Sequence, residues 1–125
     1  MIHGSCLCGA TAFEIDGALA PGSLCHCSQC RRQTSHVYAS THVPDSALRL
    51  TRAEHLRWYR ASPAARRGFC GQCGSVLFWD PADEAMISVS LGALQPPHPG
   101  QVARHIFTGD APGYYPLDDG LPKAD

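Results

Sequence analysis

Apolar and polar residues alternate along several short segments of the chain. In residues 10–16, Phe13 and Ile15 fall on one face of an extended chain, and in residues 36–43 the alternate positions from Val37 onward do the same. Such a period of two is typical of a strand that is buried on one face, and a short apolar run is consistent with a fully buried strand. The predicted strands are residues 10–16, 36–43, 47–50, 55–60, 76–79, 85–91 and 104–108.

Glycine and proline residues, which favour turns, lie between these segments. Several short strands separated by turn residues favour an antiparallel all-β fold, and only residues 28–34 predict a helical turn, with Ser28 as its N-cap. A chain of 125 residues is long enough to bury one core. We therefore expect a single domain over residues 1–125, with little helix and with residues 121–125 as a loosely held tail.

Charge, apolar content and cysteine usage limit which binding partners and which cellular compartment we expect for this protein. The formal net charge is −1, which does not favour a general binder of nucleic acid or of an anionic membrane. No segment approaches the roughly 20 apolar residues of a membrane span, and residues 1–4 lack the start of a leader peptide. The seven cysteines are clustered and odd in number, unlike a secreted disulfide scaffold. We expect a cytoplasmic protein that acts on a small molecule.

The cysteines fall in three tight clusters, and their spacing is the strongest chemical signal in the sequence. Cysteines separated by one or two residues can direct both sulfurs at one tetrahedral ion, whereas disulfides between such neighbours are strained. The sequence therefore predicts a zinc protein. The clusters are Cys6 with Cys8, then Cys25, Cys27 and Cys30, and then Cys70 with Cys73.

The first and last clusters look like two halves of one structural site. Cys8 and Cys73 are each followed by a glycine, Gly9 and Gly74, which suits a turn that needs a positive φ after the second ligand. Four cysteines would complete the coordination of one zinc ion and join the amino-terminal segment to the middle of the chain. Zinc binding at such a site contributes on the order of 10 kcal/mol to folding in comparable small domains.

The middle cluster has only three cysteines, so a tetrahedral zinc bound there keeps one position open for water or substrate. Cys25, Cys27 and Cys30 are therefore the candidate functional site. Two alternatives remain from spacing alone. The three thiols could hold no metal and be redox-labile, or a histidine could close the site as a fourth ligand, the candidates being His26, His36, His42 and His105.

Two pairs of arginines accompany these clusters. Arg31 and Arg32 follow Cys30 directly, where their guanidinium groups could bind a substrate carboxylate or offset the charge of three thiolates. A solvated pair or a cap at a helix carboxyl terminus is the structural alternative. Arg66 and Arg67 are expected on a solvated strand face.

Five segments of the sequence form a recognisable set: GSCLCG at 4–9, CHCSQCRR at 25–32, GFCGQCG at 68–74, RHIF at 104–107 and DDGLP at 118–122. Together they resemble the glutathione-dependent formaldehyde-activating enzyme family. The resemblance runs almost from end to end, and its pattern of three cysteine clusters is more specific than a single Cys-x-x-Cys motif.

This resemblance implies a small zinc-bearing β fold, sandwich-like or tent-like, related to methionine sulfoxide reductase B and to a zinc chaperone of Rab GTPases. It implies two zinc ions, a structural one on the outer clusters and a catalytic one on Cys25, Cys27 and Cys30. The implied activity is a carbon–sulfur lyase reaction that forms or cleaves S-(hydroxymethyl)glutathione from glutathione and formaldehyde. A non-catalytic thiol-binding zinc protein, a sulfoxide reductase and an interaction module are the alternatives.

The chemistry agrees with an open zinc, because a metal-bound thiol is deprotonated and can attack an aldehyde carbon. A histidine is the usual proton donor near neutral pH. His26 and His105 are nevertheless expected to have structural roles, and Tyr38, Trp58 and Trp79 are expected in the core.

Overall fold

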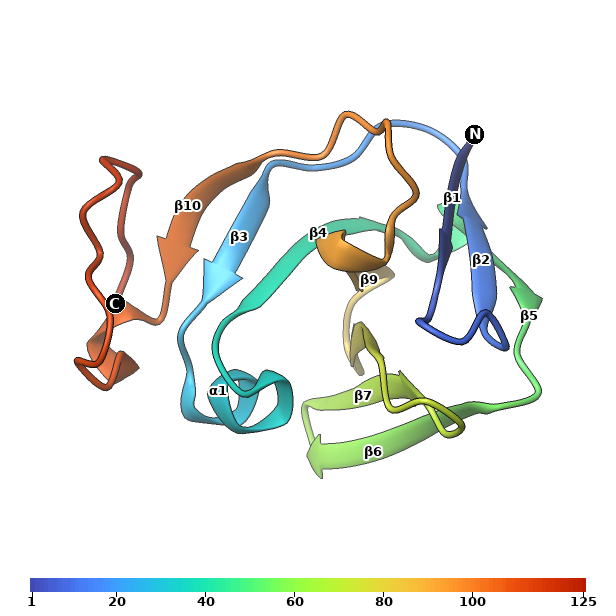
Figure 1. The fold of residues 1–125 in the computed structure, drawn as a ribbon, viewed down its shortest axis with the longest axis horizontal. Helices are drawn as coiled ribbons and strands as arrows, with labels where there is room; N and C mark the ends of the chain where they lie inside the picture. The colour runs from blue at the N-terminus through green and yellow to red at the C-terminus, as the bar shows by residue number, and fades with distance from the viewer.

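The computed structural model describes residues 1–125 and consists of two β-sheets, one short α-helix and three 3-10 turns (Figure 1). The strands are β1 (Ile2–Ser5), β2 (Ala12–Ile15), β3 (Gly22–Cys25), β4 (Tyr38–Pro44), β5 (Leu48–Arg52), β6 (Leu56–Ser62), β7 (Ala65–Cys70), β8 (Val76–Pro81), β9 (Met86–Ser90) and β10 (Val102–Ile106). The helix is α1 (Ser28–Thr34), and the 3-10 turns are η1 (Asp45–Ala47), η2 (Leu91–Ala93) and η3 (Thr108–Asp110).

The smaller sheet has the strand order β1-β2-β5, and the larger has the order β10-β3-β4-β9-β8-β7-β6. All neighbouring strands pair antiparallel except β10 and β3, which are parallel. The predicted all-β fold with little helix is thus confirmed. Figure 1 shows the small sheet and the amino terminus on one side of the molecule, and β10 and the carboxyl terminus on the other.

The main core joins the two sheets. Phe13 of β2 contacts Phe78 of β8 edge-on, with ring centroids 5.2 Å apart. Ten buried residues form this cluster, and two of them are the cysteines Cys6 and Cys70. The first and last cysteine clusters are therefore built into the packing between the sheets.

The apolar patterns found most strands, but they missed β1, β3 and β7. In these strands small or polar residues take the buried positions: Gly4 in β1, Ser23 in β3 and Arg67 in β7. At Gly4 the reason is steric, because a Cβ atom would lie 2.3 Å from Cζ of Phe13. Hydrophobic alternation cannot reveal a strand that is buried through glycine, serine or arginine.

Strand β4 also departs from the expected alternation. Its buried residues are Tyr38, Ser40, Thr41 and Val43, so the buried side changes in the middle of the strand. Tyr38 packs with Cys25 and Cys30 in a second, smaller cluster, whereas Val43 belongs to the main core. The two ends of β4 thus face different parts of the interior.

The carboxyl-terminal residues are bound to β10, contrary to the expectation of a loose tail. The backbone N–H of His105 donates to the carbonyl of Pro122 at 2.8 Å, and the N–H of Ala124 donates to the carbonyl of His105 at 3.0 Å. These bonds satisfy backbone groups on the outer edge of the larger sheet, which would otherwise be unpaired.

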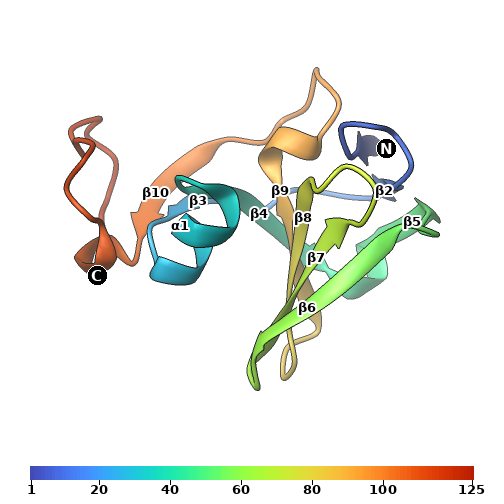
Figure 2. The same ribbon diagram turned by 60° about the horizontal axis from the view of Figure 1, so that its bottom comes forward.

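Helix α1 lies between the β10–β3 edge of the larger sheet and the end formed by β6, β7 and β8 (Figure 2). It spans seven residues. Neither α1 nor any 3-10 turn has the length and apolar character that crossing a membrane would require.

Candidate metal centres

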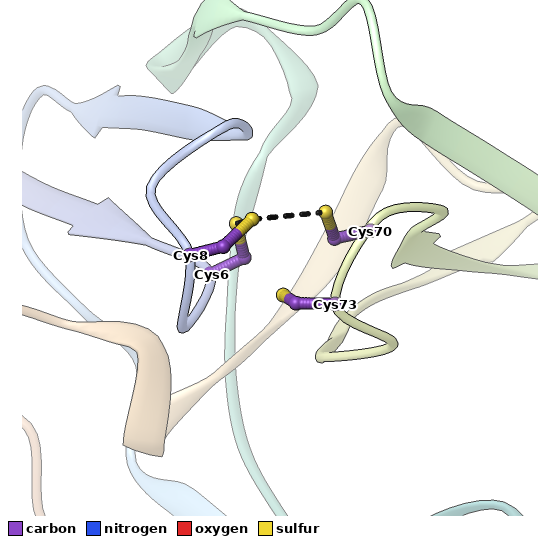
Figure 3. Close-up of side chains that lie close together, drawn as sticks. All are labelled: Cys6, Cys8, Cys70 and Cys73. Carbon is purple, nitrogen blue, oxygen red and sulfur yellow. Dashed lines mark hydrogen bonds between the residues drawn. The ribbon is translucent and has the colours of Figure 1, made fainter.

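The first candidate metal centre contains Cys6, Cys8, Cys70 and Cys73, whose sulfur atoms all lie within 4.8 Å of one another. Figure 3 shows the four side chains converging from two separate turns. The Sγ atoms of Cys6 and Cys8 are 3.7 Å apart, and those of Cys8 and Cys70 are 3.9 Å apart. A tetrahedral zinc with Zn–S bonds of about 2.3 Å separates its sulfurs by about 3.8 Å. The donor set therefore fits a zinc ion.

Two similar turns present these cysteines. Gly9 and Gly74 both have φ of 81°, the left-handed conformation that the glycines predict. The N–H of Gly74 donates to the carbonyl of Cys70 at 2.7 Å, and the N–H of Gly9 donates to that of Cys6 at 3.2 Å. Each turn therefore places its two sulfurs on one side of the backbone.

Ser75 links the two turns and supports one of the thiols. Its hydroxyl accepts a hydrogen bond from the N–H of Leu7 at 3.0 Å and lies 3.2 Å from Sγ of Cys73. The hydrogen bond with Ser75 is the main cause that lowers the pKa of Cys73, to about 5. The Cys73 thiolate, the form that binds a metal, is thereby favoured.

The second candidate centre contains Cys25 at the end of β3, Cys27 before α1 and Cys30 within α1, and their sulfurs also lie within 4.8 Å of one another. No histidine, aspartate or glutamate side chain joins this group. The structure therefore does not favour the closed site in which a histidine supplies a fourth ligand.

Local structure explains how three cysteines so close in sequence converge. Cys27, not Ser28 as predicted, is the N-cap of α1, and its Sγ accepts a hydrogen bond from the N–H of Cys30 at 3.3 Å. The cap bends the chain between β3 and α1, so the helix returns Cys30 toward Cys25. A cysteine is an unusual cap, which is why the sequence pointed to the serine beside it.

A buried arginine contacts this centre. Nη1 of Arg67 lies 3.5 Å from Sγ of Cys30 and donates to Oε1 of Gln33 at 3.0 Å, while Nη2 donates to Oε1 of Gln29 at 3.2 Å. Arg67 is 5% exposed, so the prediction of a solvated position was wrong for this residue. Its neighbour Arg66 lies on the opposite face of β7, stacked over Trp58 and bonded to Asp80.

The thiols of the second centre are electrostatically unequal. A hydrogen bond with Cys25, followed in importance by the contact with Arg67, lowers the pKa of Cys30 to about 6. The same hydrogen bond, together with burial, raises the pKa of Cys25. The thiolate of Cys30, beside the guanidinium, is therefore favoured over that of Cys25.

All three cysteines line a cleft of about 490 Å³. Arg67 and Arg104 also line it, as do the acidic residues Glu84 and Asp110 and one histidine, His42. Arg31 and Arg32 are not among the lining residues. No sequence pattern assigned a site role to Arg67, Arg104, Glu84 or Asp110, because only contacts between segments distant in sequence show which side chains line the cleft.

His26 and His105 do not line the cleft and instead form a buried pair, as expected for structural histidines. Nε2 of His26 lies 2.8 Å from Nδ1 of His105, and Nδ1 of His26 lies 2.5 Å from the hydroxyl of Tyr115. Nε2 of His105 lies 2.9 Å from the Asp119 carboxylate. Burial, and then the charge of His105, lower the pKa of His26. This chain of contacts anchors the carboxyl-terminal segment to β10 and to the loop after β3.

The fold and these two centres define a small β protein with two cysteine-based candidate metal sites. Residues 1–110 match the sequence model of a family described as "Glutathione-dependent formaldehyde-activating enzyme". The chain belongs to this family, in agreement with the resemblance carried by its sequence motifs.

Two individual proteins extend the comparison. A Halomonas elongata protein, provisionally named as a glutathione-dependent formaldehyde-activating enzyme, is 27% identical over 94% of this chain and 82% of its own length. A crystal structure of a Rhodobacter sphaeroides protein superposes with a TM-score of 0.67, covering 98% of this chain and 99% of that one at 25% identity. The arrangement of the whole chain is therefore shared with a solved structure.

Proposed function

We propose that this protein is a zinc-dependent carbon–sulfur lyase that forms or cleaves an S-(hydroxymethyl)glutathione-type adduct of glutathione and formaldehyde or a related aldehyde. One observation carries the proposal most: Cys25, Cys27 and Cys30 converge within the reach of one metal ion and line a cleft. Family membership supports the choice of thiol and aldehyde as substrates.

The two centres take different roles in this proposal. Cys6, Cys8, Cys70 and Cys73 hold a structural zinc, and Cys25, Cys27 and Cys30 hold the catalytic one. Zinc bound by three thiolates supplies a position for the substrate thiol and favours its deprotonation. Because its seven free cysteines need reducing conditions, we also place the protein in the cytoplasm.

The remaining steps depend on side chains in the cleft. The glutathione sulfur forms a bond to the aldehyde carbon, the carbonyl electron pair moves to oxygen, and a proton must reach that oxygen. His42 is the only histidine that lines the cleft, which favours it as the proton donor over His26 and His105. The reverse reaction returns the same proton as the carbon–sulfur bond breaks.

Binding of the glutathione carboxylates requires a positive group in the cleft. Arg104 lines the cleft and is our first candidate. The prediction of Arg31 and Arg32 for this role stands as an alternative that substitution can test. Arg104→Gln is expected to raise KM for glutathione more than it lowers kcat, whereas an effect confined to Arg31→Gln would favour the earlier assignment.

The rate of exchange between glutathione, formaldehyde and their adduct tests the proposal directly. Exchange NMR with the zinc-loaded protein should show a faster rate than buffer alone, and Cys27→Ser should abolish the increase. An unchanged rate would sink the lyase proposal. Glutathione binding without rate acceleration would support the non-catalytic thiol-binding alternative instead.

A methionine sulfoxide reductase-like activity is less well supported. Each of the seven cysteines belongs to one of the two centres, so none is isolated to act as a separate nucleophile. The reductase alternative would need a ligand of one centre to leave its cluster during the reaction.

A further inference from the structure

Arg67 is a buried cation without a carboxylate partner. The ion pairs of the chain join Arg49 to Glu14, Arg66 to Asp80, and histidines to Glu14 and Asp119, and none includes Arg67. A buried guanidinium that is not neutralised is strongly destabilising. The group beside Arg67 that can carry negative charge is the thiol of Cys30, 3.5 Å away.

The environment of Arg67 is built to hold the guanidinium in place. Gln29 and Gln33 are four residues apart and therefore lie on the same face of α1, and both accept hydrogen bonds from Arg67. These amides fix the orientation of the guanidinium but add no charge. Among the side chains that contact the guanidinium of Arg67, only the Cys30 thiol can supply a counter-charge.

A zinc ion bound by three thiolates has a net negative charge, and an incoming glutathione thiolate makes the charge more negative. In a partly buried site such charge needs a positive neighbour. Neither Arg31 nor Arg32 lines the cleft. Arg67 does line it, and it contacts Cys30, one of the proposed zinc ligands. The charge compensation that the sequence suggested for the first pair of arginines is thus better matched by Arg67.

We propose that Arg67 is a positioning residue of the three-cysteine centre, whose charge stabilises the thiolates around the metal ion and the thiolate of the substrate. This role rests on the proposed zinc site of Cys25, Cys27 and Cys30. It does not depend on which aldehyde reacts. Partners of this kind around a metal site are worth about 10- to 100-fold in metal affinity.

The zinc affinity of the three-cysteine centre tests this role of Arg67. It is measured by competition with a chromophoric chelator, and native mass spectrometry counts the bound zinc ions as a check. Arg67→Met should weaken this affinity about 10- to 100-fold while zinc at the four-cysteine centre is retained. Arg66→Met is the matched control on the other face of the same strand, and should change it by no more than about twofold.

Two further variants separate charge from packing. Arg67→Lys keeps the charge and Arg67→Gln keeps only a hydrogen-bond donor, so the expected order of affinity is parent, then Lys, then Gln. The same order is expected for the affinity of glutathione. Should Arg67→Met fail to fold, these two variants decide the question. Equal affinity in the Lys and Gln variants would overturn the role of Arg67.

Failure of this role is distinguishable from failure of the proposed function. If the parent protein binds a second zinc and the Arg67 variants bind it equally well, only the role of Arg67 is overturned. If the parent binds no second zinc, both are overturned. If zinc affinity follows the expected order but adduct exchange is not accelerated, Arg67 retains its role and the lyase proposal fails.

Discussion

The two cysteine centres share a chemistry but differ in how their ligands are placed along the chain. The four-cysteine centre joins residues 6–8 to residues 70–73, and two of its cysteines are part of the core between the sheets. The three-cysteine centre draws all its ligands from residues 25–30 and lines a cleft. A metal ion in the first therefore crosslinks distant segments, whereas one in the second closes only a short loop.

Electrostatics deepens the contrast. In the four-cysteine centre, hydroxyl and backbone groups around the two turns support the thiolates, as Ser75 does for Cys73. The three-cysteine centre has a buried guanidinium beside Cys30 instead. Four cysteine ligands supported by uncharged hydrogen-bonding groups suit a site that only binds its metal. An open coordination position with a nearby cation suits a site that also accepts an anionic ligand.

Removing a ligand from the four-cysteine centre should have the largest effect. Cys73→Ser is expected to lose most of the zinc-derived stabilisation, on the order of 10 kcal/mol, which is comparable to the whole stability of a small domain. Circular dichroism should therefore show a variant that is already largely unfolded and has no cooperative transition on heating. A Cys73→Ser protein that melts like the parent would remove the structural role of this centre.

Removing a ligand from the three-cysteine centre should abolish function but preserve the fold. In Cys27→Ser the serine hydroxyl can still cap α1, because serine is among the preferred N-cap residues. We expect one zinc instead of two, no acceleration of adduct exchange, and cooperative unfolding close to that of the parent. If Cys27→Ser and Cys73→Ser lost stability equally, the division between the two centres would be wrong.

A smaller change should sharpen the comparison further. Gly74→Ala forces a left-handed φ on alanine and should cost about 1 to 2 kcal/mol at the four-cysteine centre only. Gly92→Ala is the matched control, since its added Cβ meets no atom within 4 Å and its φ is not left-handed. Urea unfolding measures both variants, and zinc affinity at the three-cysteine centre should stay unchanged. A shift in that affinity in Gly74→Ala would show that the centres are coupled.

The sequence was sufficient for the cysteine groups because spacing and the glycines at positions 9 and 74 reflect local turn geometry. It was sufficient for strands such as β2 and β9, in which most of the buried residues are apolar. It was insufficient for β3 and β7, where serine and arginine are buried, and therefore also for the residues that these strands bring to the cleft.

Arg67 illustrates the limit most clearly. Two consecutive arginines on a strand point to opposite faces, and composition gives no reason to bury either one. Only the pairing of β7 with β8, together with the position of α1, shows that Arg67 meets Cys30 while Arg66 meets Trp58 and Asp80. Contacts between elements distant in sequence decide such cases.

The most direct test of the division between the two centres is native mass spectrometry of freshly reduced protein, with and without glutathione. We predict two zinc ions per chain and a glutathione adduct for the parent, and one zinc ion with no adduct for Cys27→Ser. A single zinc ion and no adduct in the parent, or an adduct that survives Cys27→Ser, would contradict an open, thiol-binding centre at Cys25, Cys27 and Cys30.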